Sequence, residues 1–106
     1  MHTHMHTGLA IVTIDQNPEL LFESQNVMLT CLIGGVSATD ANYTWMRDGG
    51  VELTGSEDNV MLLGNQLNIT NVSIAEWDGV SIACQAISMT TMGSGSVNLT
   101  VTSKSL

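Results

Sequence analysis

The sequence predicts an all-β sandwich of two antiparallel sheets, and three observations support this fold class. Short apolar runs, many with a period of two, alternate with turn-forming clusters of Gly, Asn, Asp, Ser and Thr. No stretch keeps a period of 3.6 residues long enough for a helix of ordinary length. The 106 residues fit one domain, and a hydrophobic fraction of 43% is enough to fill one sandwich interior.

The first strands are expected close to the N-terminus. Residues 9–14 form the first, after which Pro18 is expected to mark a switch between sheets, because proline has no N–H for the ladder. A short continuation covers residues 20–22. The next strand covers residues 26–33 and ends at Gly34-Gly35, where a polar loop begins.

Similar turn signals bound the remaining strands. Asp48-Gly49-Gly50 and Gly64-Asn65 are predicted turns. The segment 88–95, which is rich in Ser, Thr, Met and Gly, is predicted to be a loop. The strands between and after these segments are expected at 43–47, 51–54, 59–63, 66–70, 79–86 and 96–102.

Strand parity provides an internal test of these strands. If Cys31 and Cys84 both point inward, the residues two positions away from each must point inward as well. These neighbours are all apolar: Leu29, Ile33, Ile82 and Ala86. The same register turns Asn68 and Asn98 outward.

The two cysteines leave two alternatives open. They are far apart and have no third or fourth ligand nearby, which argues against a zinc site. They are therefore either two free buried thiols or a disulfide formed in an oxidising compartment. Four Asn-x-Ser/Thr sequons favour a secreted glycoprotein, and hence the disulfide. The candidate glycosylation sites are Asn42, Asn68, Asn71 and Asn98.

The charge balance excludes several classes of partner. Ten acidic residues face only two basic ones, Arg47 and Lys104, so the formal net charge is −8. Nucleic acid, heparin and anionic lipid each need clustered Lys or Arg, and none is expected to bind. Four acids could form a weak Ca²⁺ site, but we prefer to interpret them as a solvated edge. They are Asp48, Glu52, Glu57 and Asp58.

Catalytic machinery is not expected. All three histidines lie within the first six residues, and Lys104 is in the tail, so the many serines lack a base. Both cysteines are assigned to the core. No glycine-rich loop of the phosphate-binding kind is present, and no cofactor is expected. The sequence therefore does not predict an enzyme.

The two ends of the chain are expected to lie outside the domain. Residues 1–8 are interpreted as a leader or purification tag, 9–103 as the domain and 104–106 as a tail. His2, His4 and His6 could instead bind a transition metal, although we prefer the tag. No stretch reaches the ~18 apolar residues of a membrane span, and no signal-peptide layout is present. We therefore expect a soluble piece of a longer secreted or membrane-anchored chain.

A series of motifs recurs in an order that is typical of one family. They are Cys31, Trp45-Met46-Arg47-Asp48-Gly49, Leu67-x-Ile69, Asp78 six residues before the second cysteine, Cys84-Gln85-Ala86, and Val97-x-Leu99-x-Val101. From about residue 9 onward the chain thus resembles the immunoglobulin superfamily, in particular its intermediate set of adhesion and receptor domains.

The resemblance implies an immunoglobulin-like Greek-key β-sandwich with one inter-sheet disulfide. Cys31 and Cys84 would form this bridge, and the Trp45 indole would pack against it. Closing so long a loop would stabilise the fold by about 4 kcal/mol in the chain-entropy model. The core residues that the resemblance implies are Trp45, Leu67, Ile69, Ile82 and Leu99.

The chain departs from the family pattern around its second cysteine. Val80 and Ile82 stand where the family usually has Gly and Tyr, so the tyrosine-corner hydrogen bond is expected to be missing. Asp78 lacks its usual Arg partner, and we expect its carboxylate to accept backbone N–H groups in the turn instead. The segment 72–78 is also longer than usual and contains Trp77.

Two surfaces are candidate interfaces. The first is the predicted loop, because methionine adapts readily to binding partners, although its methionines could instead cap the core. The second is the outward face of strand 26–33, although singly exposed apolar residues are normal. The residues concerned are Met89, Thr90, Thr91 and Met92 in the loop, and Met28 and Leu32 on the strand.

Together these features predict a non-enzymatic extracellular module of a cell-surface receptor or adhesion protein. It would recognise a protein ligand or a second copy of itself, and a receptor tyrosine kinase ectodomain is one candidate parent. The alternative is a structural spacer domain in a multi-domain extracellular chain, without a ligand of its own.

Overall fold

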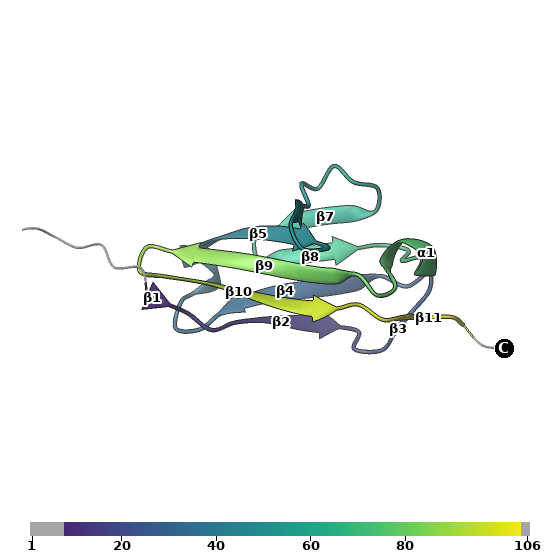
Figure 1. Ribbon diagram of the computed structural model, residues 1–106, viewed down its shortest axis with the longest axis horizontal. Coiled ribbons are helices and arrows are strands. Elements are labelled where there is room, and N and C mark those ends of the chain that lie inside the picture. Colours follow the sequence, from purple (N-terminus) through teal and green to yellow (C-terminus); the bar gives the residue numbers. More distant parts are fainter. Residues whose placement is uncertain (1–7, 105–106) are drawn as a thin grey trace, which may run out of the picture.

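The computed structural model describes residues 8–104, which form two β-sheets packed face to face (Figure 1). In spatial order the five-stranded sheet contains β1 (Gly8–Leu9), β10 (Thr91–Asn98), β9 (Ser81–Ser88), β5 (Ala41–Arg47) and β6 (Val51–Glu52). The four-stranded sheet contains β2 (Val12–Asn17), β4 (Val27–Ile33), β8 (Gln66–Ile69) and β7 (Val60–Leu63). The parallel pair β3 (Leu21–Phe22) and β11 (Val101–Thr102) lies at one end. The two short helices are η1 (Ala38–Asp40) and α1 (Ile74–Trp77).

The predicted two-sheet, all-β architecture is confirmed. The strands of the central part of the chain start and end within two residues of the predicted positions. The alternation of buried and exposed residues determines which side of a strand faces the core. In β4 every second side chain is buried, while those between are partly or fully exposed. The hairpin turn at Gly64-Asn65 joins β7 to β8, as expected.

The first predicted strand, 9–14, is in fact divided between two sheets. β1 pairs in parallel with β10, whereas β2 pairs antiparallel with β4. Between them the Ala10 N–H donates to a carbonyl of β10, and the Ile11 carbonyl accepts an N–H from the turn after β4, both at 2.8 Å. The prediction of one continuous strand is wrong because the chain changes pairing partner here. The switch expected at Pro18 is confirmed, since β3 beyond it pairs with β11.

The loop predicted over 88–95 is also wrong, because β10 occupies most of this segment. Gly93 and Gly95 lie where residues 10–12 cross over β10. A Cβ atom on Gly93 would collide with the carbonyl oxygen of Ala10, and one on Gly95 with the carbonyl oxygen of Val12. These glycines therefore serve close backbone packing inside a strand.

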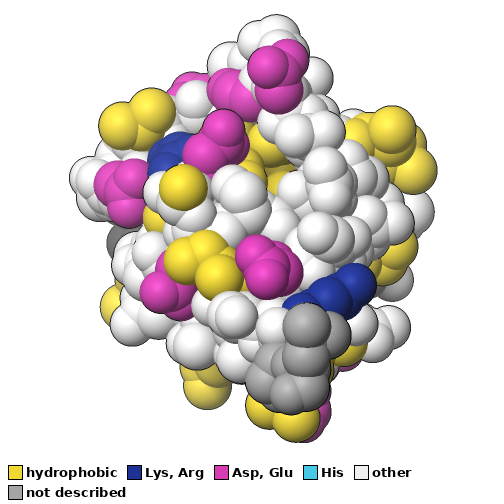
Figure 2. Space-filling model, turned by 90° about the vertical axis from the view of Figure 1, so that its right-hand side faces the viewer, with side chains coloured by type: hydrophobic (Ala, Val, Ile, Leu, Met, Phe, Trp, Pro, Cys, Tyr) yellow, Lys and Arg dark blue, Asp and Glu magenta, His cyan; other side chains and the backbone are white. Residues whose placement is uncertain are grey.

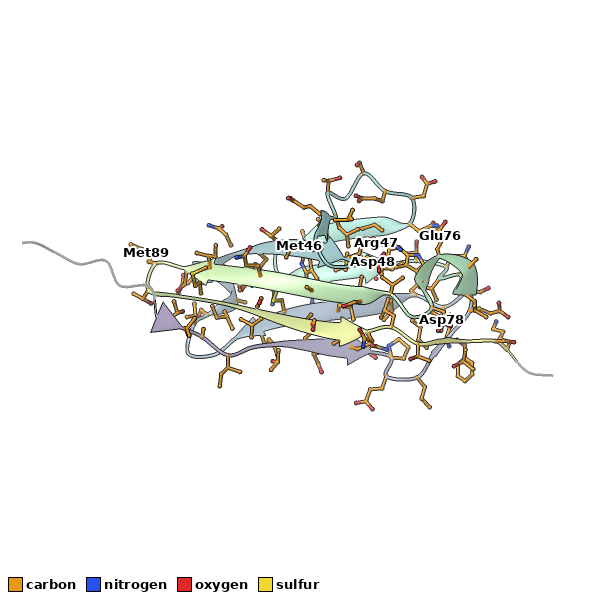
Figure 3. The ribbon with its side chains drawn as sticks, viewed as in Figure 1. Met46, Arg47, Asp48, Glu76, Asp78 and Met89 are labelled. Carbon is orange, nitrogen blue, oxygen red and sulfur yellow. A yellow bond between two sulfur atoms is a disulfide. The ribbon has the colours of Figure 1, made fainter. Side chains whose placement is uncertain are left out.

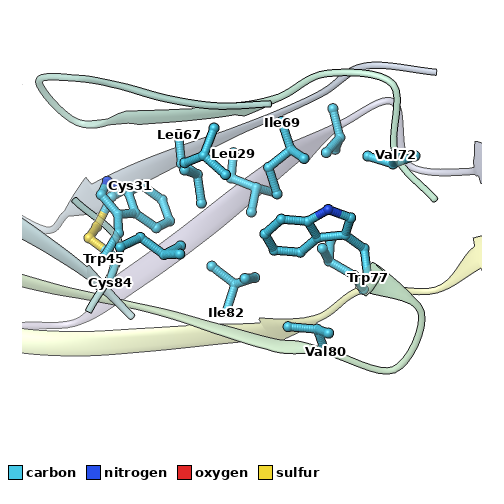
Figure 4. Packing of buried hydrophobic residues seen from close by; sticks show 14 of the residues in the cluster. Leu29, Cys31, Trp45, Leu67, Ile69, Val72, Trp77, Val80, Ile82 and Cys84 are labelled. Carbon is cyan, nitrogen blue, oxygen red and sulfur yellow. A yellow bond between two sulfur atoms is a disulfide. The ribbon is translucent and has the colours of Figure 1, made fainter. Parts of the chain in front are cut away.

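The core fills the space between the sheets, and among the described residues no polar or charged side chain is buried. The Cys31–Cys84 disulfide joins β4 to β9, and the Trp45 indole lies beside it (Figure 4). All five core residues that the resemblance implied are at most 2% exposed. The Nε1 atom of Trp45 is buried and has no hydrogen-bond partner in residues 8–104.

A second tryptophan closes the core at the end that holds α1. The Ser73 hydroxyl caps this helix by accepting the Glu76 N–H at 3.2 Å. One helical turn then brings Trp77 into the core, where it is 2% exposed (Figure 4). The guanidinium of Arg47 covers this indole at 4.5 Å from the ring centroid, a cation–π geometry.

Arg47 also ties α1 to the turn after β5. Its Nη2 donates to the Glu76 carbonyl at 3.1 Å, and its Nε donates to an Asp48 carboxylate oxygen at the same distance (Figure 3). Asp78, the usual partner of an arginine in the family, instead accepts the Val101 N–H at 2.9 Å. The expected backbone-acceptor role of Asp78 is thus confirmed, but its donor lies in β11 and not in the turn.

Candidate recognition surface

The outer face of the five-stranded sheet is almost free of charge. Because the residues of β9 that face the core are fixed by Cys84, the alternate residues of β9 and their partners in β10 and β5 face outward. Only Glu52, at the β6 edge, is ionisable among these outward side chains. They are Leu9, Met92, Ile87, Asn42, Ser94, Gln85, Thr44, Ser96, Ala83, Met46, Asn98, Ser81 and Glu52.

One row of this face is apolar. Leu9, Met92 and Ile87 lie opposite one another on β1, β10 and β9. Leu9 is 93% exposed and Ile87 is 43% exposed, while Met92 is half-buried between them. We call these three residues the apolar row. Paired residues on neighbouring strands point to the same side of a sheet, so the three side chains lie next to one another on this face.

A tight turn next to the apolar row presents a further methionine. Only Met89 and Thr90 lie between β9 and β10. The Ser88 hydroxyl accepts the N–H groups of Thr90 and Thr91 at 3.2 and 3.0 Å, which fixes the turn. Met89 is 82% exposed at the tip of the sandwich (Figure 3). It therefore does not cap the core.

An open groove of about 800 Å³ lies between this turn and the segment that contains η1. Its walls include Val36, Asp40, Asn42 and Met89. The Tyr43 hydroxyl donates to the Ala38 carbonyl at 2.7 Å and so fixes η1 against β5. Burial and the nearby Asp40 carboxylate raise the pKa of Tyr43.

The six residues predicted as interfaces lie on two separate surfaces. Met89 and Thr90 form the turn, and Thr91 and Met92 belong to β10. Met28, half-buried, and Leu32, 48% exposed, lie on the outer face of the four-stranded sheet. Met92 therefore belongs to the same sheet as the strands that flank the turn, whereas Met28 and Leu32 belong to the other sheet.

Sequence reasoning missed Leu9 and Ile87. Ile87 could have been found, because the parity set by Cys84 turns it outward. Leu9 could not, since its position beside Met92 depends on the parallel pairing of β1 with β10.

The acidic residues do not form a metal centre in the described part of the chain, where no group of three potential ligands was found. Glu57 instead accepts the N–H groups of Thr54 and Gly55 at 3.1 and 2.9 Å. These hydrogen bonds lower the pKa of its carboxylate. Acidic side chains are spread over the end that holds α1 and β11 (Figure 2). His2, His4 and His6 lie outside the described residues.

Residues 8–104 also contain no helix that is long and apolar enough to cross a membrane. β1 begins at Gly8, the last residue of the predicted leader.

Comparisons of sequence alone find no relatives: no family model and no curated protein matches the chain. Solved structures do match. The ectodomain of mouse nectin-like molecule 4 superposes with a TM-score of 0.70 at 17% identity, over 90% of this chain and 31% of that one. The N-terminal Ig1-2 module of the Drosophila receptor protein tyrosine phosphatase DLAR gives a TM-score of 0.68 at 14% identity, over 91% and 50%. Titin M4 gives a TM-score of 0.59 at 17% identity, over 94% and 100%.

These similarities define the class of the protein: it is a disulfide-bonded β-sandwich with the immunoglobulin fold. The fold that the resemblance implied is thereby confirmed. The chain spans 31% and 50% of the two longer structures, and the identities are low, so the similarity concerns the fold alone.

Proposed function

We propose that this domain is a non-enzymatic extracellular recognition module of a cell-surface receptor or adhesion protein. Its binding surface would be the outer face of the five-stranded sheet, centred on the apolar row. The observation that carries the proposal is the lack of charge on this face in a chain whose net charge is −8. Charged residues are depleted from the centres of protein–protein interfaces, where desolvation is complete.

A second copy of the chain is the simplest partner for such a face. Two copies that meet through it need not bring carboxylates together, because only Glu52 at one edge is ionisable. Other protein partners with an uncharged, partly apolar face fit equally well. A glycan at Asn98 would lie at the far end of the face from the apolar row. Asn42 lies directly opposite Ile87, so a glycan there would lie beside the row.

The test is sedimentation of the purified, oxidised chain at increasing concentration, with binding to a panel of cell-surface ectodomains measured in parallel. Ile87→Asp places a charge in the apolar row and is expected to weaken binding about tenfold or more. Leu20→Asp is the matched control, because Leu20 is 77% exposed but lies in the turn before β3, away from this face. It should behave as the wild type does.

The spacer alternative also has structural support. β1 and β11 lie at opposite ends of the sandwich, an arrangement that suits domains joined end to end (Figure 1). A chain that stays monomeric, and that binds no ectodomain in a manner sensitive to Ile87→Asp, would favour the spacer over the recognition module.

A further inference from the structure

The outer face of the four-stranded sheet holds an asparagine between two methionines. Asn68 of β8 lies directly opposite Met28 of β4 on one side and Met61 of β7 on the other. Directly opposed side chains of an antiparallel pair have Cβ atoms about 5 Å apart, so the three form a contiguous row. Met61 is 62% exposed, and two leucines on the same face, Leu63 and Leu32, are 71% and 48% exposed.

Asn68 is the acceptor residue of the sequon Asn68-Ile69-Thr70. Its side chain must point outward, because Leu67 and Ile69 on either side of it are fully buried. Within residues 8–104 its amide makes no hydrogen bond that a modification would break. The half-buried state of Asn68 has a simple cause, since the two methionines flank it.

The other three sequons differ in their surroundings. Asn98 faces Ser81, and Asn42 faces Ile87 on one side only. Asn71 lies in a turn with a φ of 49°, and its N–H donates to Asn26. Of the four sequons, Asn68 alone has apolar side chains opposite it on both neighbouring strands.

We propose that Asn68 carries an N-linked glycan whose first sugars lie across Met28 and Met61 and cover this face. The Asn68 Nδ2 atom would lose one proton and bond to the anomeric carbon of an N-acetylglucosamine. The bond from that carbon to the diphosphate of a lipid-linked oligosaccharide donor breaks, and the diphosphate leaves with the electron pair. The inference rests on the proposed extracellular function, because this donor acts in the secretory pathway.

The glycan gives the exposed methionines and leucines an occupant that the protein itself supplies. A sugar ring has C–H groups on its faces and hydroxyl groups at its edge, so it can contact apolar side chains and still be hydrated. The bulky, solubilising glycan would thereby remove an apolar patch that otherwise favours association. The four-stranded sheet would then be shielded, and the five-stranded sheet would remain free for a partner.

The experiment uses the full chain secreted from a mammalian cell line, with glycan occupancy measured by peptide mass spectrometry. We expect Asn68 to be modified in the wild type and in Thr70→Ser, which keeps the sequon. It should be unmodified in Thr70→Ala, which destroys the sequon but retains Asn68. Asn71→Gln in each background removes the neighbouring acceptor, so that the peptide reports on Asn68 alone.

Shielding is tested by binding of a fluorescent apolar dye before and after enzymatic removal of the glycan. Dye fluorescence should rise about twofold on removal, and Met61→Asp should cancel the rise. Asn68→Gln is a second unglycosylated variant in case Thr70→Ala fails to fold. Its fluorescence should exceed that of the glycosylated wild type, as that of Thr70→Ala should.

Two results would overturn the inference. One is an unmodified Asn68 in secreted, disulfide-bonded protein, whether or not Asn42 or Asn98 is modified. The other is dye binding that does not change when the glycan is removed. Neither result bears on the recognition proposal, which stands or fails with Ile87→Asp on the opposite sheet.

Discussion

Trp45 and Trp77 fill the two halves of one core in different ways. Trp45 lies in the middle of β5, beside the disulfide, with its Nε1 atom buried and unpaired within the described chain. Trp77 ends a one-turn helix and is covered by the guanidinium of Arg47. The half of the core around Trp45 is stabilised by the disulfide and by regular strands. The half around Trp77 is stabilised by the helix cap of α1, the cation of Arg47 and hydrogen bonds to irregular backbone. Two equally buried indoles therefore depend on different interactions.

The strongest test of the disulfide half is its removal by Cys31→Ala with Cys84→Ala. The bridge closes a loop with a sequence separation of 53, so its loss should destabilise the fold by about 4 kcal/mol. This is comparable with the net stability of a small domain, and folding near body temperature should be lost. Urea denaturation followed by circular dichroism measures the effect. An unchanged unfolding midpoint would contradict the role assigned to the bridge.

The corresponding test of the α1 half is Trp77→Ala. Truncation of a buried indole leaves a cavity and should cost about 3 kcal/mol. The same denaturation experiment measures it, with Leu20→Ala as a control at an exposed position. A loss below about 1 kcal/mol would mean that α1 can close over the core without its tryptophan.

A Trp→Phe change at each position separates the two indoles more finely. Both variants lose a similar apolar area. Trp45→Phe also removes a buried N–H that has no partner, and so avoids the roughly 1–3 kcal/mol needed to desolvate this group on folding. Trp77→Phe instead weakens the ring on which Arg47 stacks. Thermal unfolding should therefore show Trp45→Phe to be the milder change. The reverse order would argue that the Trp45 N–H is satisfied in solution.

Arg47→Met tests the cation above Trp77 and should cost about 1 kcal/mol. Arg47→Lys keeps the charge and should recover part of this loss. Asp48→Asn is the control for the ion pair, which is partly exposed and should contribute well under 1 kcal/mol. If Asp48→Asn were as harmful as Arg47→Met, the ion pair and not the stacking would be the dominant interaction.

The smallest effect is expected at Glu57. Its folded-state pKa is lowered below the ordinary value of 4.5 by N–H donors from Thr54, from Glu57 itself and from Gly55. Because the folded pKa is depressed, the stabilisation is present above the ordinary pKa and is lost as the pH falls through the lowered value. An NMR titration of the Thr54 and Gly55 amides should therefore give a midpoint below 4.5. Glu57→Gln should abolish the transition, whereas Asp58→Asn should retain it.

The regular half of the molecule was predictable from the sequence. Cys31 and Cys84 fix the inward parity of two strands, and that parity correctly assigned Leu29, Ile82 and Ala86 to the core. The period of two applies wherever a strand is half-buried, so local sequence carries this information.

The irregular half was not predictable in the same way. Trp77 enters the core through a single helical turn, and four residues are too few to show a period. Its partner Arg47 is distant in sequence, and the contact arises only when β5 packs beside α1. The division of strand 9–14 and the loop wrongly predicted over 88–95 have a related cause. Both depend on how the first strands cross β10, a long-range contact with no local signal.

The candidate surface was predictable from the sequence only in part. Parity from Cys84 would have turned Ile87 outward, but Met92 lies in the segment predicted as a loop, and its place opposite Ile87 follows only from the pairing of β10 with β9. Leu9 joins them only through a parallel pairing between the two ends of the domain. The position of Asn68 between two methionines likewise requires the register of three strands.

Gly93 and Gly95 have a consequence for how relatives of this domain can be recognised. Since the atom nearest to a Cβ at either position is a backbone carbonyl oxygen, of Ala10 or of Val12, substitution should displace this part of the chain from β10. Homologues that keep the same crossing are therefore expected to retain two glycines separated by one residue in the penultimate strand. Such a Gly-x-Gly pair would be a sequence marker of the close packing of the first strands on β10. The spacing of the cysteines and the tryptophan carries no information about this packing.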